Sequence, residues 1–308
     1  MKNLSALSII YDCYSFRNLA CSLYCFDWLY CRKKAKFRSI YPFSSQFVCI
    51  FPALIIDNLY KTTLSGENAI SITIGFLITF IILCVLAWQL SHYLQFTTDL
   101  KKSLVTTTAL PNVGNLGLPV TLFALGEAGL ERAIVYLIAW NIVVLMTVPA
   151  FLQSGGFRSS IQFMLKLPLT WAVTFGICLR VFNVPLPLNL DKGLNLLANA
   201  AIPVALLMLG IQIASHRLAF NLYEVGASCL RLLGGAVIAF LVGKLLGLED
   251  LDLKVLVLQS SMPTAITAFL MVHEFGGDAS QTARVVVVST LLAFITLPGV
   301  LLALQTFI

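Results

Sequence analysis

The sequence has little charge. Only 11% of its 308 residues are Asp, Glu, Lys or Arg, whereas soluble domains carry about 25%. Hydrophobic residues make up 59% of the chain, and the mean hydropathy is +0.91. This composition excludes a disordered chain and disfavours a soluble globular enzyme. We therefore expect most of the chain to lie in a lipid bilayer.

Residues for metal, nucleotide and nucleic-acid binding are also scarce. His92, His216 and His273 stand singly, and the eight cysteines include no C-x-x-C pair, so no metal site is predicted. No G-x-x-x-x-G-K-[ST] loop for ATP is present. The net charge is +6, and the one dense run of basic residues, 32–38, does not match a nucleic-acid-binding motif. We expect no cofactor, no metal and no nucleic-acid partner.

Glycine is missing from the start of the chain. Residues 1–65 contain none, and all 19 glycines lie at or after Gly66, while five of the eight cysteines fall in the first 49 residues. We hypothesise that roughly the first 47 residues are read out of frame or have diverged, and treat 1–49 as a separate segment that includes the first helix. An aliphatic, glycine-containing helix in another reading frame of the gene would support this hypothesis.

Apolar runs between charges, glycines and prolines predict an all-α polytopic membrane protein of about ten spans. The fold is expected to be helical throughout, since lipid cannot satisfy a free backbone amide or carbonyl. Basic residues are more frequent in the odd-numbered loops, eleven against seven, which predicts a multi-pass protein of the cell membrane with both termini outside the cytoplasm. The predicted spans are 4–31, 40–62, 68–95, 103–125, 130–152, 161–182, 193–214, 221–247, 253–274 and 284–306.

The chain divides near Gly155-Gly156 into two halves of five predicted helices each. The first half consists of the segment 1–49, which includes the first helix, and its remainder, 50–155. The second half is 156–308. An odd number of helices per half makes the second half enter the membrane from the opposite side, so the repeat is expected to be inverted. Such repeats are common in secondary transporters.

Prolines recur at corresponding places in the two halves. The second helix of each half contains one, Pro52 and Pro203, and the fourth contains Pro111 and Pro119 in the first half and Pro263 in the second. Proline inside a helix removes a hydrogen bond and interrupts the helix. Interrupted helices at matching positions are the best sequence indication of a transporter binding site.

The interrupted fourth helix carries Asn112 and Asn115, and its counterpart 259–267 is uncharged and rich in hydroxyl groups. Asparagine offers both a donor and an acceptor without titrating. Half-helix ends together with neutral amides suit a small anion or a polar solute. For the Ser and Thr residues, interhelical packing by small polar side chains is the alternative interpretation.

Three motifs resemble the auxin efflux carrier family of membrane transporters. They are N-x-G-x-x-G-x-P at 112–119 followed by G-E-x-G at 126–129, Met262-Pro263 followed by H-E-F-G-G-D at 273–278, and the run 200–210. The resemblance covers about 51–308. It implies ten helices in two inverted five-helix repeats, with fourth and ninth helices that are broken and cross at their prolines. It also implies a non-enzymatic carrier that exports small organic anions by alternating access.

On this resemblance Asn112, Pro119 and Pro263 match the crossing motif, whereas Asn115 replaces a residue that is usually apolar or aromatic. The partners expected are a small organic anion and the lipid bilayer, with a homodimer as an open possibility. The predicted substrate-binding residues are Asn112, Asn115, Gly117, Pro119, Pro263, Thr264 and Thr267.

Charged residues inside predicted spans are candidates for ion coupling. Asp57 lies near the end of the second span, where an acid costs about 2.5–3.5 kcal/mol at mid-membrane. Lys61 lies four residues later on the same helix face. A coupling pair and an ordinary interfacial ion pair are both open interpretations. Arg231, alone in the eighth span, is expected to extend toward the cytoplasmic interface.

Two other classes of function compete with a carrier. An intramembrane aspartyl protease needs G-x-G-D, but 275–278 lacks the first glycine, and a prenyl-transferring enzyme needs paired aspartates where only Asp57-Asn58 occurs. A channel or receptor is the third class, and no charged ring or filter-like repeat favours it.

Overall fold

The computed structural model describes residues 49–62, 64–152, 165, 168–182, 186, 190–214, 221–248 and 250–307. The predicted span 4–31 and the segment hypothesised to be out of frame lie outside these residues, apart from Cys49. Over the described ranges the structure is helical and contains no β-strand, only one isolated bridge. The expectation of an all-α protein is therefore confirmed for this part of the chain.

Helices occupy the described portion of every predicted span from 40–62 onward. Two of the spans, 103–125 and 253–274, are interrupted in the middle, as their prolines predicted. Two short π-helical turns, η3 and η5, adjoin regular helices. The elements are α5 (Phe51–Lys61), α6 (Gly66–Tyr93), α7 (Thr98–Ala109), η3 (Val113–Gly117), α8 (Leu118–Leu152), α10 (Pro168–Val181), α11 (Leu190–Asn199), α12 (Ala201–Ala214), α13 (Leu222–Cys229), η5 (Leu230–Gly234), α14 (Gly235–Leu245), α15 (Asp250–Ser260), α16 (Ile266–Phe275) and α17 (Ala279–Phe307).

Helix boundaries follow local chemistry. Ser65 caps α6, because its hydroxyl oxygen accepts a hydrogen bond from the backbone N–H of Asn68 (3.2 Å). Glycines in the left-handed region mark the exits of both interrupted helices: Gly126 has φ of 70° and Gly276 has φ of 104°. A side chain would be strained at either position, so the chain turns there into the next helix.

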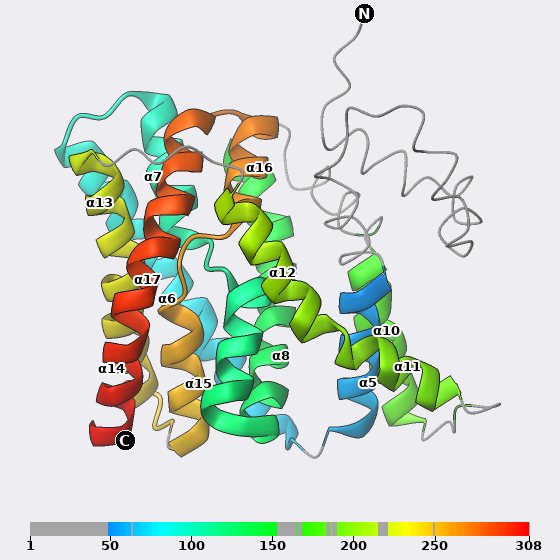
Figure 1. Ribbon diagram of the computed structural model, residues 1–308. Coiled ribbons are helices and arrows are strands. Elements are labelled where there is room, and N and C mark those ends of the chain that lie inside the picture. The colour runs from blue at the N-terminus through cyan, green and yellow to red at the C-terminus, as the bar shows by residue number, and fades with distance from the viewer. Residues whose placement is uncertain are drawn as a thin grey trace, which may run out of the picture.

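The helices form two groups. α5 packs against α10 and α11, while α6, α7, α8 and α13–α17 make up a larger bundle, and α12 connects the groups by packing on η3 and α8. Figure 1 shows the α6–α7 and α16–α17 connections at one end of the bundle. The α14–α15 connection and the C-terminus lie at the other end.

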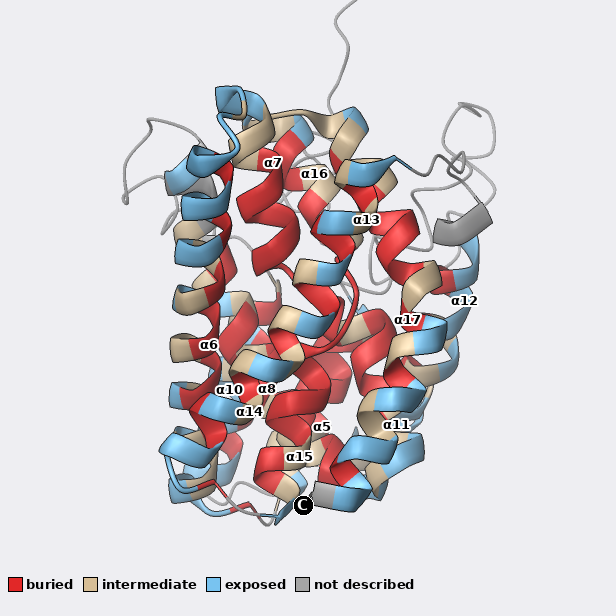
Figure 2. Cartoon of the chain, turned by 90° about the vertical axis from the view of Figure 1, so that its left-hand side faces the viewer, coloured by how far each residue is buried: buried red, intermediate tan, exposed pale blue. Residues whose placement is uncertain are grey.

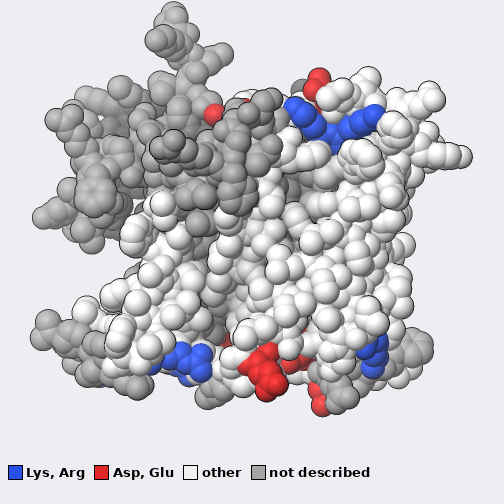
Figure 3. Space-filling view, turned by 180° about the vertical axis from the view of Figure 1, so that it is seen from behind, with Lys and Arg blue, Asp and Glu red and all other residues white. Residues whose placement is uncertain are grey.

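The outer surface is apolar. Ile70 on α6 and Ile295 on α17 are 61% and 75% exposed, and Figure 2 shows buried residues concentrated in α7, α15 and α16. Figure 3 shows an uncharged belt on one face, with acidic and basic side chains at its two ends. Such a belt suits lipid and would be costly in water. In the part of the chain that the structure describes, four helical stretches are long and apolar enough to cross a membrane, namely Gly66–Tyr93, Leu190–Ile211, Leu222–Leu245 and Ala279–Thr306.

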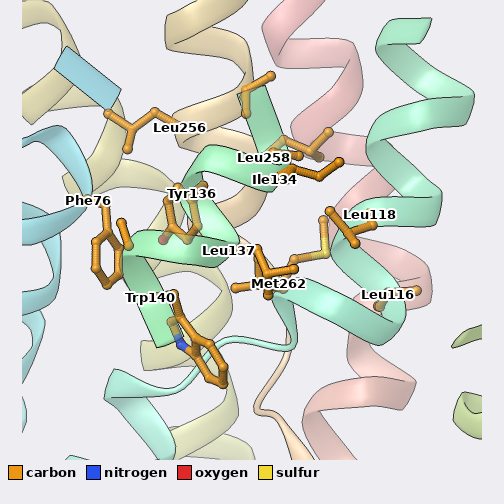
Figure 4. Close-up of a cluster of buried hydrophobic side chains, with 14 of the residues drawn as sticks. Phe76, Leu116, Leu118, Ile134, Tyr136, Leu137, Trp140, Leu256, Leu258 and Met262 are labelled. Carbon is orange, nitrogen blue, oxygen red and sulfur yellow. The ribbon is translucent and has the colours of Figure 1, made fainter. Parts of the chain in front are cut away.

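Inside the larger bundle, aromatic and aliphatic side chains from α6, α8 and the second interruption form a continuous core (Figure 4). Phe76 meets Tyr136 edge to face, with ring centroids 4.8 Å apart. Trp140 and Met262 belong to the same cluster. This packing fixes the α8 segment that faces the interruptions.

Helix α14 approaches the end of α15 so closely that only glycine fits. A Cβ atom on Gly235 would lie 2.0 Å from the carbonyl oxygen of Ser260, whereas one on Gly234 would meet only ordinary contacts. We predict that Gly235→Ala lowers the free energy of unfolding by about 1–3 kcal/mol through overpacking. Gly234→Ala, the matched control, should change it by less than about 1 kcal/mol. Equal melting temperatures of the two variants in detergent would contradict this packing.

Candidate functional site

The two interrupted helices meet at their interruptions. α7 ends at Ala109 and the next helical turn begins at Val113, while α15 ends at Ser260 and α16 begins at Ile266. The extended segments between these ends, 110–112 and 261–265, lie antiparallel to each other and pair through Pro111 and Thr264.

Backbone hydrogen bonds join the two segments directly. The N–H of Asn112 donates to the carbonyl oxygen of Pro263 (2.7 Å), and the N–H of Ala265 donates to that of Leu110 (2.9 Å). Each interruption thus satisfies groups that the other leaves open, as a non-aqueous environment demands. The sequence predicted a crossing at Pro119 and Pro263, but the proline opposite the second interruption is Pro111. Pro119 lies eight residues later, within continuous helix after the π-turn η3.

Thr264 strengthens this pairing. Its buried hydroxyl donates to the carbonyl oxygen of Thr107 (3.0 Å), and its backbone N–H donates to the hydroxyl of Ser289 on α17 (3.1 Å). Thr264 therefore holds the crossing together, rather than offering its side chain to a solute.

Arg231 binds the carbonyl ends of the two helices that precede the interruptions. Its side chain is 1% exposed, and its guanidinium donates to the carbonyl oxygens of Thr108 and Ser260, at the C-terminal ends of α7 and α15. The expectation that Arg231 extends toward the cytoplasmic interface is wrong. The interruptions leave carbonyl groups without helical partners deep in the bundle, and these attract the guanidinium more directly than distant water does.

A pocket lies at the N-terminal ends of the two half-helices that follow the interruptions. About 360 Å³ of atom-free space lies in it, a figure that includes space open to solvent. Among the described residues, those that line it carry no ionisable side chain. Those that shape it most are Phe51 of α5, Asn112 and Asn115 of the first interruption, Trp140 and Asn141 of α8, and Thr267 of α16.

Several polar atoms of the lining residues have no hydrogen-bond partner among the described residues. They are Nδ2 of Asn112, Oδ1 of Asn115, Nε1 of Trp140 and Oγ1 of Thr267. The other amide atom of Asn112, Oδ1, accepts from the backbone N–H of Asn115 (3.2 Å) and caps the following helix. Buried polar groups are normally paired, so unpaired donors and an unpaired acceptor here indicate a place for a polar ligand or water.

The predicted site residues divide into two sets. Asn112, Asn115 and Thr267 line the pocket, but Gly117, Pro119, Pro263 and Thr264 do not. Gly117 packs against the Gln259 side chain so tightly that a Cβ atom would lie 2.2 Å from its Oε1. Gln259 in turn donates to the hydroxyl of Thr121 (2.9 Å).

Sequence reasoning missed Phe51, Trp140 and Asn141 as lining residues. Asn141 could have been noticed as a polar residue in the middle of the predicted span 130–152, where such residues often have a function. Phe51 and Trp140 gave no comparable signal, because aromatic residues are common throughout this chain.

Asp57 and Lys61 form the ion pair that their spacing predicted, with 2.6 Å between Lys61 Nζ and Asp57 Oδ1. Asp57 is buried and also accepts from Nδ2 of Asn195 on α11 (3.3 Å), whereas Lys61 is half exposed. The pair does not line the pocket. Asp57 lies on α5 six positions after Phe51, which corresponds to about 9 Å along the helix axis. Within the described residues no three His, Cys, Asp or Glu side chains gather into a metal site.

Comparison with known proteins gives the chain a family. A family model described as "Membrane transport protein" matches residues 43–156 and 157–301. A protein of Methanothermobacter thermautotrophicus named "Uncharacterized transporter" is 28% identical over 80% of this chain and 83% of its own length. A transporter of Methanocaldococcus jannaschii is 27% identical over 67% of this chain and 70% of its own.

A Rhizobium meliloti protein carries a more specific name, "Putative malonate transporter". It is 24% identical over 64% of this chain and 65% of its own length. Matches to the family model cover most of the described residues, including both interrupted helices and the pocket. The chain belongs to the auxin efflux carrier family of membrane transport proteins, and its apolar helices are those of a multi-pass membrane transporter.

Proposed function

We propose that this protein is a secondary carrier of small organic anions, and that the pocket at the crossing binds the substrate. The observation that carries the proposal is the set of unpaired donors on Asn112, Trp140 and Thr267 around a pocket where no described lining residue is ionisable. A carboxylate accepts several hydrogen bonds at once, which suits such a set of donors.

Helix ends add to this preference for negative charge. The helical segment 113–125 and α16 both begin at the pocket, and each helix N-terminus is equivalent to roughly +0.5 of an elementary charge. Two such ends attract about one negative charge without any fixed cation in the pocket. A neutral pocket also releases its substrate readily, as a carrier must.

One relative suggests which anions to test first. Since the Rhizobium relative is named for malonate, we propose short dicarboxylates as the first candidates.

The arrangement of the two helix groups supports a mechanism of alternating access. The pocket is lined by α5 from the smaller group and by α8, α16 and the two interruptions from the larger bundle. Movement of one group against the other would open the pocket first to one end and then to the other. No bound nucleotide is required, and an ion gradient or the membrane potential would supply the energy.

We further propose ten helices in two inverted repeats, with both termini outside the cytoplasm of the cell. The first repeat comprises a helix in 1–49 and the remainder 50–155, and the second is 156–308. Matching features of the interrupted helices support the repeat. α7 and α15 contain 12 and 11 residues, each interruption is followed by a second half-helix, and each of these ends at a glycine with positive φ. A long helical segment follows in both cases.

We predict that Asn112→Asp lowers malonate counterflow in proteoliposomes at least about tenfold. The substitution retains the oxygen that caps the helix but replaces the donor with a negative charge, and a hydrogen bond to a charged group contributes about 1.5–3 kcal/mol. Thr267→Val should act in the same direction. Asn199→Ala, at an exposed amide on α11, is the control. Undiminished counterflow in both pocket variants, with wild-type counterflow established, would remove the site assignment.

For Asp57 we predict a role in coupling rather than in binding. Asp57→Asn should keep malonate counterflow within about twofold, because the residue does not line the pocket, but should reduce accumulation driven by an imposed pH gradient. Glu67→Gln, at an exposed acid on α6, is the matched control. Gradient-driven uptake equal to wild type in Asp57→Asn would assign the pair a purely interfacial role.

A further inference from the structure

Two helix C-termini bring partial negative charge together at the crossing, and Arg231 lies against them. α7 and α15 both end there, and each helix C-terminus is equivalent to roughly −0.5 of an elementary charge, or about −1 together. The guanidinium of Arg231 binds a carbonyl oxygen from each of these two ends. It forms no ion pair with any carboxylate of the described residues. Its single positive charge therefore matches the charge of the two helix ends.

We propose that Arg231 is a resident cation at the two carbonyl ends, and that it thereby lets the pocket bind an anion without a metal cation at the crossing. This inference rests on the proposed function and goes one step further. It names the residue that decides whether anion transport at this crossing needs a co-transported cation.

The charge count gives the reason. Two C-terminal ends contribute about −1 and two N-terminal ends about +1, so the crossing by itself would be neutral overall. Adding Arg231 raises the total to about +1, which one carboxylate in the pocket then balances. Arginine stays protonated at any physiological pH, so this contribution does not switch off.

The position of Arg231 is fixed by its own helix. It belongs to η5, and one turn later the backbone at Gly235 touches the carbonyl oxygen of Ser260. On the far side, the hydroxyls of Tyr136 and Ser260 are hydrogen-bonded (3.0 Å), which anchors the end of α15 to α8. Arg231 is covalently part of η5 and therefore serves as a permanent charge, unlike a cation that enters and leaves.

Arg231→Ala tests this inference by removing the resident cation. The purified variant and wild type are each assayed in choline, sodium or guanidinium chloride at tens of millimolar. For each salt, the melting temperature in detergent and malonate counterflow are measured. Lys244→Ala, which removes a cation lying 5.9 Å from the Phe240 ring on α14, is the control.

We expect wild type and Lys244→Ala to transport equally well, within about twofold, in choline and in sodium. Arg231→Ala should lose about tenfold or more in choline, because one partner of a buried charge arrangement is missing. Small cations, guanidinium above all, should restore its counterflow several-fold and raise its melting temperature. Guanidinium should not raise the melting temperature of wild type, whose carbonyls are already occupied.

Three results would overturn the inference: sodium-dependent counterflow by wild type, undiminished counterflow by Arg231→Ala in choline, or a folded Arg231→Ala on which no cation acts. If Arg231→Ala does not fold, Arg231→Lys serves instead. Arg231→Lys keeps the positive charge, so malonate counterflow that is the same in choline and in sodium supports the inference. Counterflow that requires sodium opposes it.

Failure of the proposed function looks different. Wild type would then show no malonate counterflow, while the melting temperature of Arg231→Ala, which needs no substrate, would still report whether the vacated carbonyls bind a cation.

Discussion

A peptide group inside a bilayer must find its hydrogen-bond partner within the protein, because lipid offers none. This constraint governs the centre of the molecule, where two helices are broken. The interruptions satisfy it jointly: Asn112 donates to Pro263, Ala265 donates to Leu110, and Arg231 binds carbonyls at both preceding helix ends. Neither interruption has this set of partners alone, so each broken helix depends on the other.

The same arrangement separates the two kinds of helix end. Carbonyl ends are covered by Arg231 on one side of the crossing, while the amino ends begin at the pocket on the other. In the proposed anion site, backbone dipoles and neutral side chains face the substrate, while Arg231 lies outside the pocket. Binding strength and release can then be tuned through Asn112, Trp140 and Thr267.

The first part of each interrupted helix also contacts the residues that follow the second part of the other interrupted helix. Near one end of the bundle, Arg132 at the start of the second part of α8 pairs with Asp252 on α15. Near the other end, the N–H of Asp278, beyond α16, donates to the hydroxyl of Ser103 on α7 (2.8 Å). These contacts tie the crossing into one unit, whereas the α5, α10 and α11 group meets it mainly through α12. Relative movement is therefore expected between the groups rather than within the crossing.

Features that depend on local chemistry could be predicted from the sequence. Charge scarcity and apolar runs indicated a helical membrane protein, prolines located both interruptions, and the motifs around Asn112 and Pro263 identified the family. The pairing of Asp57 with Lys61 also follows from a spacing along one helix. All of these can be read because a short stretch of chain encodes each one.

The way in which distant segments share their unpaired groups could not be predicted from the sequence and came from the three-dimensional packing. This packing placed Pro111 rather than Pro119 opposite Thr264, brought Trp140 and Asn141 to the pocket, and turned Arg231 inward to two carbonyl ends that lie more than 25 residues away in the chain on either side. A sequence lists possible donors and acceptors, but three-dimensional packing decides which of them meet. In a bilayer, that choice decides where a charge is stable and where a substrate can bind.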